Sequence, residues 1–363
     1  MMRRSNSRAG TASSALFAGL VLFSGAASAQ ASERHTLAGS EVAIYNLAGS
    51  IRVEGASSEG DVVVEVRRMG NGGDRLKVAT GQVRGRETLR VIFPERDIVF
   101  RREGERRWGG ETRVRVNDDG TFGDNGKDRW NDRDEVEIRS SGRGYEGYAE
   151  VRVLVPKGKR VDLHLAVGDA SASNVDGDFS FDVSAATVTT TKTRGSLSLD
   201  TGSGEVNVSD AEGELRLDSG SGSVTLTRVK GDHLVIDSGS GSVRGNTLDS
   251  DELSLDSGSG RIRLEAVRAR TLDIDSGSGS VELQLLSDVD HLRADAGSGS
   301  VTLGIPESLG AELHIDSGSG GIDIDIPISI THRDRDSLNG KIGDGRGKIE
   351  IDAGSGGVRL RRS

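Results

Sequence analysis

The chain has 363 residues, of which 52 are Gly, 3% are aromatic and none is Cys. Without Cys it can form neither a disulfide scaffold nor a thiolate metal site. Its formal net charge of −10 argues against a nucleic-acid partner, because phosphate backbones are bound by basic surfaces.

The first 29 residues have the composition of a secretory signal peptide. Arg3, Arg4 and Arg8 precede an apolar run over about residues 15–23, and small residues follow up to Ala29. This run is shorter than the roughly 20 residues that span a membrane, and no later segment is longer or more apolar. We therefore expect residues 1–29 to be cleaved and the protein to be exported. It would be periplasmic, extracellular or at the cell surface, with no transmembrane segment in the mature chain.

Residues 30–157 form a predicted β-rich N-terminal region. Short stretches of alternating apolar residues recur in it, as in 42–47, 62–67 and 151–155, and no helical periodicity is present. Arg, Asp and Gly dominate residues 101–147, which we expect to be long exposed hairpin loops. The aromatic residues in or beside these loops are Trp108, Trp130, Tyr145 and Tyr148.

From residue 158 the chain repeats itself. The pentapeptide DSGSG, or its variants DTGSG and DAGSG, occurs eight times at successive spacings of 18, 19, 19, 19, 20, 21 and 36 residues. The long last spacing contains a polar insertion, placed at 331–348. The eight motifs begin at Asp200, Asp218, Asp237, Asp256, Asp275, Asp295, Asp316 and Asp352.

Apolar residues keep a fixed register to each motif Asp. They stand three and one residues before it, as at Leu253 and Leu255, and six and eight residues after it, as at Ile262 and Leu264. A fifth position, eleven residues after the Asp, is apolar or Pro in Val229, Leu248, Val267, Leu286, Pro306 and Pro327. The inward positions change parity across the motif. We expect this change at the second Gly or just after it, with both motif Ser inward and both Gly outward.

This pattern predicts an all-β fold, a parallel β-solenoid of roughly 19-residue coils preceded by the smaller β-rich N-terminal region. One unit cannot bury its apolar face alone, whereas stacked units form a continuous core. The repeat domain would cover 158–363. We expect the coils to stack in chain order, with residues 348–363 as the last coil and the insertion folded over the same end.

Three stretches resemble a bacterial domain family of unknown function labelled "putative adhesin". They are residues 39–66 (GSEVAIYNLAGSIRVEG and onward), residues 151–175 (VRVLVPKGKRVDLHLAVGDASASNV) and residues 338–360 (LNGKIGDGRGKIEIDAGSGGVRL). The resemblance covers most of the mature chain. It implies an exported β-solenoid with no established enzymatic activity, and it supplies no catalytic residues.

The motif Asp is the strongest candidate for chemistry. Stacked carboxylates about 5 Å apart repel one another, so another interaction must offset this repulsion. Each Asp could accept hydrogen bonds from the N–H groups of its own turn, which we favour. Alternatively calcium could bind between neighbours, as hard oxygen ligands suit it. This calcium ladder would comprise Asp200, Asp218, Asp237, Asp256, Asp275, Asp295 and Asp316.

No catalytic or cofactor-binding residue is predicted. The six His share no spacing typical of a metal site, and a glycoside hydrolase needs two differentiated carboxylates, whereas the ladder offers equivalent ones. The sequence thus favours a non-enzymatic adhesin or cell-envelope scaffold. A calcium-binding module and a carbohydrate-active β-helix enzyme are the alternatives. The expected partner is an envelope or surface protein or a glycan, and the protein is expected to be a monomer.

Overall fold

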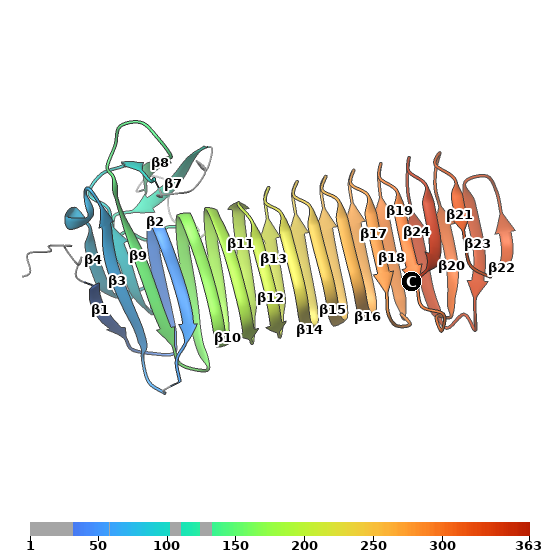
Figure 1. Ribbon diagram of the computed structural model, residues 1–363, viewed down its shortest axis with the longest axis horizontal. Coiled ribbons are helices and arrows are strands. Elements are labelled where there is room, and N and C mark those ends of the chain that lie inside the picture. The colour runs from blue at the N-terminus through green and yellow to red at the C-terminus, as the bar shows by residue number, and fades with distance from the viewer. Residues whose placement is uncertain (1–31, 58, 102–109, 124–132) are drawn as a thin grey trace, which may run out of the picture. The chain divides into compact units, whose positions relative to one another are not determined.

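A computed structural model describes residues 32–57, 59–101, 110–123 and 133–363. The predicted signal peptide, Trp108 and Trp130 lie outside these residues. Among the described residues one 3-10 turn, η1 (Gly73–Arg75), is the only helical element, and all other elements are strands. Figure 1 shows them stacked along one axis, which confirms the predicted all-β solenoid with a small β-rich region at its N-terminal end.

Strands β1 to β9 belong to the N-terminal region and β10 to β25 to the repeats. The first group is β1 (Ser32–Leu37), β2 (Glu41–Gly55), β3 (Val62–Gly70), β4 (Lys77–Val83), β5 (Arg86–Ile92), β6 (Asp97–Val99), β7 (Glu111–Asn117), β8 (Arg133–Arg139) and β9 (Gly147–Val155). The second group begins with β10 (Lys159–Arg194), β11 (Leu197–Ser203), β12 (Val206–Glu212), β13 (Leu215–Ser219), β14 (Val224–Ser238), β15 (Val243–Ser257), β16 (Ile262–Ser276) and β17 (Val281–Leu285). It ends with β18 (His291–Ala296), β19 (Val301–Ile305), β20 (Ala311–Asp316), β21 (Ile322–Ile324), β22 (Ser329–Arg333), β23 (Ser337–Ile342), β24 (Gly347–Asp352) and β25 (Val358–Arg362).

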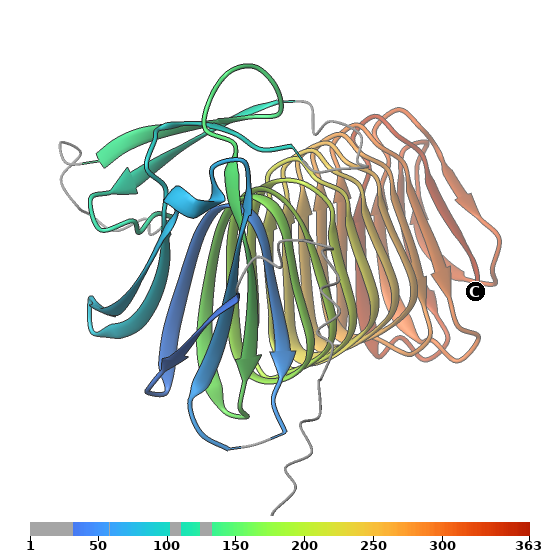
Figure 2. The same cartoon turned by 60° about the vertical axis from the view of Figure 1, so that its left-hand side comes forward.

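Equivalent residues of successive coils pair in parallel, so each side chain lies next to the side chain at the same repeat position of the next coil. Leu234 pairs with Leu253, and Leu253 with Leu272. The four inward positions nearest the motif are buried as predicted, with Leu253 and Ile262 fully inaccessible, except at Ile322 and Ile324, which are partly exposed. A single apolar core therefore runs through the stack, inside the coils that Figure 2 shows one behind the other.

The N-terminal region continues this stack. β2 pairs in parallel with β10 on one side and with β9 and β5 on the other. β6, β7 and β8 form a separate three-stranded sheet, so part of the predicted loop region is regular strand. Tyr145 is buried and its hydroxyl donates to the carbonyl of Gly72 at 2.5 Å. The boundary at 157/158 stays a prediction.

The change of parity comes earlier in the motif than expected. Ser219, the first Ser of its motif, is buried as predicted, but Ser221 is exposed and Gly222 is buried. The chain therefore changes phase between Gly220 and Ser221. The prediction that both Ser point inward is wrong for the second one, because the corner turns before it.

A second corner lies ten residues after the motif Asp, or after the residue equivalent to it, in each coil from His164 to Asp256. Non-Gly residues stand there with φ between 52° and 60°, the left-handed region that L residues avoid. In order they are Asn174, Lys192, Asp210, Arg228, Thr247 and Ala266. The next coil lacks this residue, since β17 continues in plain alternation and buries Leu285. Leu286 is consequently 39% exposed, and its predicted inward position is wrong.

The last coil in sequence is not the last coil in space. β24 pairs in parallel with β18 on one side and with β20 on the other, and β25 lies likewise between β19 and β21. The expectation that residues 348–363 end the rod is therefore wrong. The end is built by β23, which adds antiparallel to β20, and by β22, which adds antiparallel to β23; together they contain half of the predicted insertion.

We predict that Thr247→Asn stabilises the protein by about 1 kcal/mol, the typical excess for an L residue in the left-handed region. The physical reason is that a β-branched residue is strained at φ 60°, whereas Asn tolerates that conformation. Urea unfolding of both proteins measures the difference. Thr227→Asn, within a regular part of β14, is the matched control and should not stabilise. Equal effects of the two substitutions would contradict the strain argument.

Candidate functional site: the aspartate ladder

The motif carboxylates form one continuous row, here called the aspartate ladder. Parallel pairing joins Asp182 to Asp200 and continues coil by coil to Asp275 and Asp295. Because of the inserted C-terminal coil, Asp352 follows Asp295 and Asp316 comes last. The ladder is thus Asp182, Asp200, Asp218, Asp237, Asp256, Asp275, Asp295, Asp352 and Asp316, nine residues at the strand spacing of about 4.8 Å.

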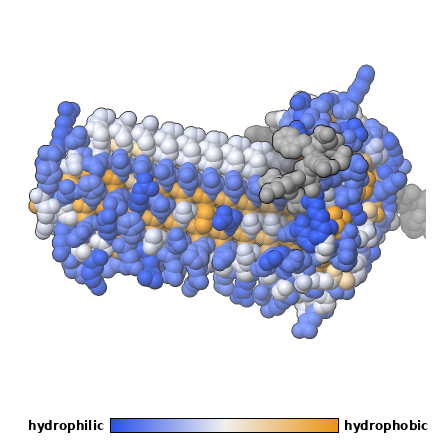
Figure 3. All heavy atoms as spheres, turned by 180° about the vertical axis from the view of Figure 1, so that it is seen from behind, coloured by the Kyte–Doolittle hydropathy of each residue, from blue (hydrophilic) through white to orange (hydrophobic). Residues whose placement is uncertain are grey.

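A ridge of Gly and Ser accompanies the ladder along the rod, visible as the pale upper edge in Figure 3. Gly is required there by the close approach of neighbouring coils. A Cβ added to Gly222 would lie 1.4 Å from the carbonyl oxygen of Gly204, and one on Gly241 would lie 1.6 Å from that of Gly222. The N–H of Gly239 donates to the carbonyl of Ser219 at 2.8 Å, so the corners are hydrogen-bonded coil to coil.

In three motifs the buried Ser (Ser238, Ser257 and Ser276), not the Asp, closes the turn, whereas Ser219 and Ser317 make no side-chain hydrogen bond among the described residues. The hydroxyl of Ser238 donates to the carbonyl of Gly241 at 3.2 Å, and Ser276 donates to Gly279 at 3.0 Å. No hydrogen bond from a turn N–H to a ladder Asp is present in the described residues. The favoured prediction that each Asp caps its own turn is therefore wrong, because the carboxylates point outward from the corner.

Most of the ladder has no counter-charge. Within the described residues, five successive members make no ion pair: Asp200, Asp218, Asp237, Asp256 and Asp275. The members near the two ends have basic neighbours, since Arg293 lies 3.2 Å from Asp295, His314 lies 3.1 Å from Asp316 and His164 lies 3.4 Å from Asp182.

Burial and repulsion raise the pKa of two ladder carboxyls. Partial burial is the larger cause for Asp200, followed by the charges of Asp182 and Asp218 on either side. Burial also raises the pKa of Asp295, together with the charges of Asp275 and Asp352, although Arg293 opposes the shift. The ladder thus behaves as a row of interacting like charges.

The N-terminal end of the ladder is covered by aromatic residues. His164 precedes Asp182 by one coil and pairs with Tyr45, whose ring stacks on the imidazole at 4.3 Å. Phe122 packs edge-on against both rings. His164 is 5% exposed, and its Nδ1 lies 3.4 Å from Asp182 without hydrogen-bond geometry. A Cβ on Gly123 would lie 2.2 Å from the Asp182 carboxylate, so the backbone at Gly123 lies directly against Asp182 and His164.

No arrangement typical of a chelating metal site is found in the described residues. They contain no group of three or more His or acidic side chains positioned to hold one ion. In the ladder each Asp of the predicted calcium set has only ladder carboxylates above and below it, plus single basic neighbours near the C-terminal end. Binding of calcium to Asp200, Asp218, Asp237, Asp256, Asp275, Asp295 and Asp316 stays a prediction.

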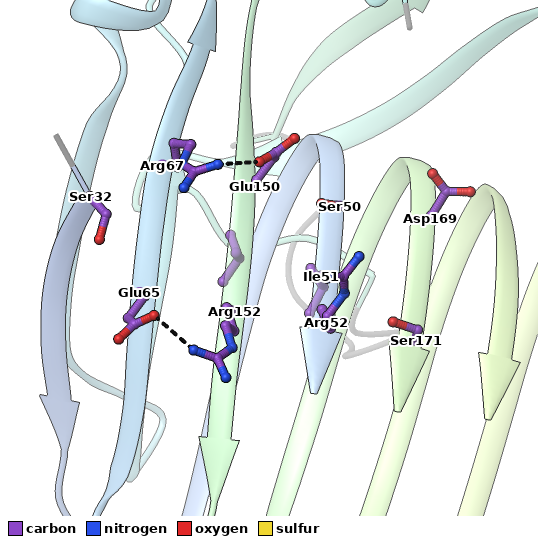
Figure 4. Close-up of a pocket in the computed structure, with 11 residues that line it drawn as sticks. Ser32, Ser50, Ile51, Arg52, Glu65, Arg67, Glu150, Arg152, Asp169 and Ser171 are labelled. Carbon is purple, nitrogen blue, oxygen red and sulfur yellow. Dashed lines mark hydrogen bonds and ion pairs between the residues drawn. The ribbon is translucent and has the colours of Figure 1, made fainter. Parts of the chain in front are cut away.

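A shallow polar hollow of about 290 Å³ lies on the outer face near the N-terminal end (Figure 4). Its two glutamates come from neighbouring antiparallel strands and are both ion-paired. Glu65 lies 3.3 Å from Arg152, and Glu150 lies 3.6 Å from Arg67. Each of these two glutamates is paired with a guanidinium, and Asp169 is a third carboxylate lining the hollow.

The comparisons with known proteins point to one family. The model of the family described as Toastrack DUF4097 matches residues 132–361. A putative cell adhesion protein from Clostridium sporogenes ATCC 15579 is 11% identical, covering 92% of this chain and 99% of that one, with a TM-score of 0.18. A putative adhesin from Bacteroides fragilis NCTC 9343 is 10% identical, covering 91% and 96%, with a TM-score of 0.30. No curated protein matches the chain.

We predict that Asp200→Asn raises the melting temperature at neutral pH and low salt. The expected gain in the free energy of unfolding is about 0.5 kcal/mol, the size typical of repulsion between like-charged neighbours. A raised pKa means that the folded state binds the proton more tightly than the unfolded chain. Ionised Asp200 therefore destabilises the fold, and stability returns as pH falls through its folded pKa. The gain from the substitution should shrink in acid and in 1 M salt.

Asp210→Asn is the matched control for this experiment. Its carboxylate accepts from Arg228 at 2.6 Å, which lowers the pKa of Asp210, so neutralising it should destabilise the protein at neutral pH. Thermal melts of both variants between about pH 3 and 7, which spans the ordinary range of carboxyl titration, show whether each substitution raises or lowers the melting temperature. If Asp200→Asn destabilises the protein as Asp210→Asn does, the ladder is not under repulsion.

Proposed function

Because this chain belongs to the Toastrack DUF4097 family, we propose that it is a non-enzymatic, exported β-solenoid that acts as an adhesin-like scaffold in the cell envelope. The family match confirms the resemblance noted in the sequence. The described part of the chain contains no helix that could serve as a membrane span. The predicted signal peptide supports a periplasmic or cell-surface location.

The observation that carries the proposal is the unneutralised aspartate ladder. Five successive carboxylates without partners stand on a backbone fixed by coil-to-coil hydrogen bonds, so a partner meets a rigid row of negative charge. Such a row favours binding of a cationic surface over catalysis at one point, because a partner with several basic groups can contact several carboxylates at once. The partner class we propose is an envelope protein or glycan with basic groups.

Binding to envelope fractions tests this proposal. We expect a variant with Asp218, Asp237, Asp256 and Asp275 all changed to Asn to lose most of the salt-sensitive binding seen with the original protein. The control neutralises the same number of exposed acids outside the ladder: Glu205, Glu212, Asp251 and Glu252. Equal loss in both variants would indicate a net-charge effect only. Turnover of a glycan in a hydrolase and lyase screen would contradict the non-enzymatic assignment.

Calcium binding to the same row is the second candidate function. The spacing of about 4.8 Å lets one divalent ion touch oxygens of two neighbouring carboxylates, since calcium–oxygen distances are about 2.4 Å. Each ion would gain few protein ligands there, so we expect calcium and magnesium to raise the melting temperature slightly and equally through screening. A large rise with calcium alone, abolished in the four-Asn ladder variant, would establish the calcium module instead.

A further inference from the structure

The aspartate ladder ends on its N-terminal side at a buried histidine. His164 lies one coil before Asp182, at the equivalent outward position of β10. It is nevertheless only 5% exposed, because Phe122 and Gly123 of the segment after β7 lie over it. Neither of its ring nitrogens has a hydrogen-bond partner among the described residues. The ladder therefore starts with an imidazole that is shielded from solvent and whose polar atoms are not satisfied.

The unpartnered Nδ1 of His164 faces a carboxylate. It lies 3.4 Å from an oxygen of Asp182, which has no other basic neighbour in the part of the chain that the structure describes. A charge-assisted hydrogen bond between these groups would be aligned and about 2.7–2.9 Å long, which this contact is not. Buried polar atoms without a partner are rare in proteins, and a bound ion is one arrangement that accounts for them.

The separation of the two atoms is that of two ligands of one tetrahedral ion. Zn²⁺ binds imidazole nitrogen and carboxylate oxygen at about 2.1 Å each, with tetrahedral angles. Two ligand atoms of such an ion lie about 3.4 Å apart, which is the distance between Nδ1 of His164 and the Asp182 oxygen. In the neutral imidazole that binds a metal in this way, the proton lies on Nε2 and the lone pair of Nδ1 points to the ion.

Aromatic packing holds the imidazole in place, and a glycine keeps the space beside it open. The ring of Tyr45 stacks on the imidazole at 4.3 Å, and the ring of Phe122 packs edge-on against it. A Cβ on Gly123 would lie 2.2 Å from the Asp182 oxygen and 2.8 Å from Nδ1 of His164. Any other residue at this position would therefore fill the space beside both ligand atoms.

We infer that His164 and Asp182 form a binding site for a borderline divalent cation such as Zn²⁺. The ladder supplies a negative potential there, because the next two carboxylates, Asp200 and Asp218, make no ion pair within the described residues. The side chain of Asp182 is 30% exposed, so an ion reaches the pair from solvent. Water completes the coordination, since no third His or acidic side chain of the described chain is placed to join the two ligands. The imidazole nitrogen favours Zn²⁺ over calcium, which prefers oxygen ligands.

The other histidines do not combine burial with an available acid. Glu33, the acid beside His35, also pairs with Arg68. The remaining four histidine side chains are between 40% and 58% exposed: His233, His291, His314 and His332. Water solvates the nitrogens of these exposed rings, so they gain less from an ion than a buried ring without a partner does.

Calorimetric titration of the mature protein with ZnCl2 tests the inference. We expect one zinc ion per chain, and a melting temperature that rises with zinc, since an ion that binds only the folded state stabilises it. His164→Gln and Asp182→Asn should each lower the association constant by at least about tenfold, the smallest loss typical of a change in the outer shell of a metal site. His164→Gln should leave any effect of CaCl2 unchanged, which separates this site from calcium binding along the ladder.

His233→Gln is the matched control. Nδ1 of His233 lies 3.2 Å from Glu252, so this pair has the same chemistry at the surface, and its loss should leave the zinc affinity unchanged. The imidazole ¹⁵N signals of the original protein identify the ligand without any substitution. Zinc should shift the Nδ1 signal of His164 and leave that of His233 in place, so the result does not depend on whether His164→Gln folds. Absence of zinc binding, or binding that leaves the His164 signal unmoved, would overturn the inference.

Discussion

Stacking of each coil directly on the one before is the constraint on which the rest of the structure depends. Corner carbonyls accept hydrogen bonds from the corner N–H groups of the next coil, for example Ser238 O from Gly258 N at 3.0 Å. This spacing leaves no room for a Cβ on the motif Gly residues. Every position of the repeat therefore lies between the same positions of the neighbouring coils, and where the residue type recurs, as at the motif Asp, it must tolerate its own kind as a neighbour.

Inward and outward positions respond to this rule in opposite ways. A buried Leu or Ile gains from an identical neighbour, at about 2 kcal/mol for each side chain removed from water. An outward Asp lowers the stability of the fold, but only by about 0.5 kcal/mol for each like-charged neighbour in solvent. With four or five inward apolar positions in each coil, the core outweighs the repulsion. The fold can thus maintain a charged row that contributes nothing to its own stability, which is the main physical support for a role in binding.

The repeat made the fold and most of the core predictable, because apolar residues such as Leu253 and Ile262 keep a fixed register to the motif. The orientation of each side chain within the corner was less predictable. Alternation alone does not show that the chain turns between Gly220 and Ser221, nor that Ser238 rather than its neighbouring Asp closes the turn. Leu286 shows the same limit, because its orientation depends on whether a left-handed residue precedes it. Each of these errors concerns a single backbone conformation that leaves no signal in hydrophobic periodicity.

The order of the coils could not be read from the repeat at all. Every coil presents the same edges, so the strand pair β24–β25 satisfies the register equally well between β18 and β20 or at the end of the rod. The signal that was available is the 36-residue spacing before Asp352, which is long enough for a strand to leave the stack and return. The chain uses those residues to build β22 and β23 first and then inserts its C-terminal coil beneath them. The insertion fixes where the rod ends and gives that end two faces of different length. A solenoid built in simple chain order would finish on a strand of the repeat, whereas here the antiparallel strands β23 and β22 form the outer edge of one face.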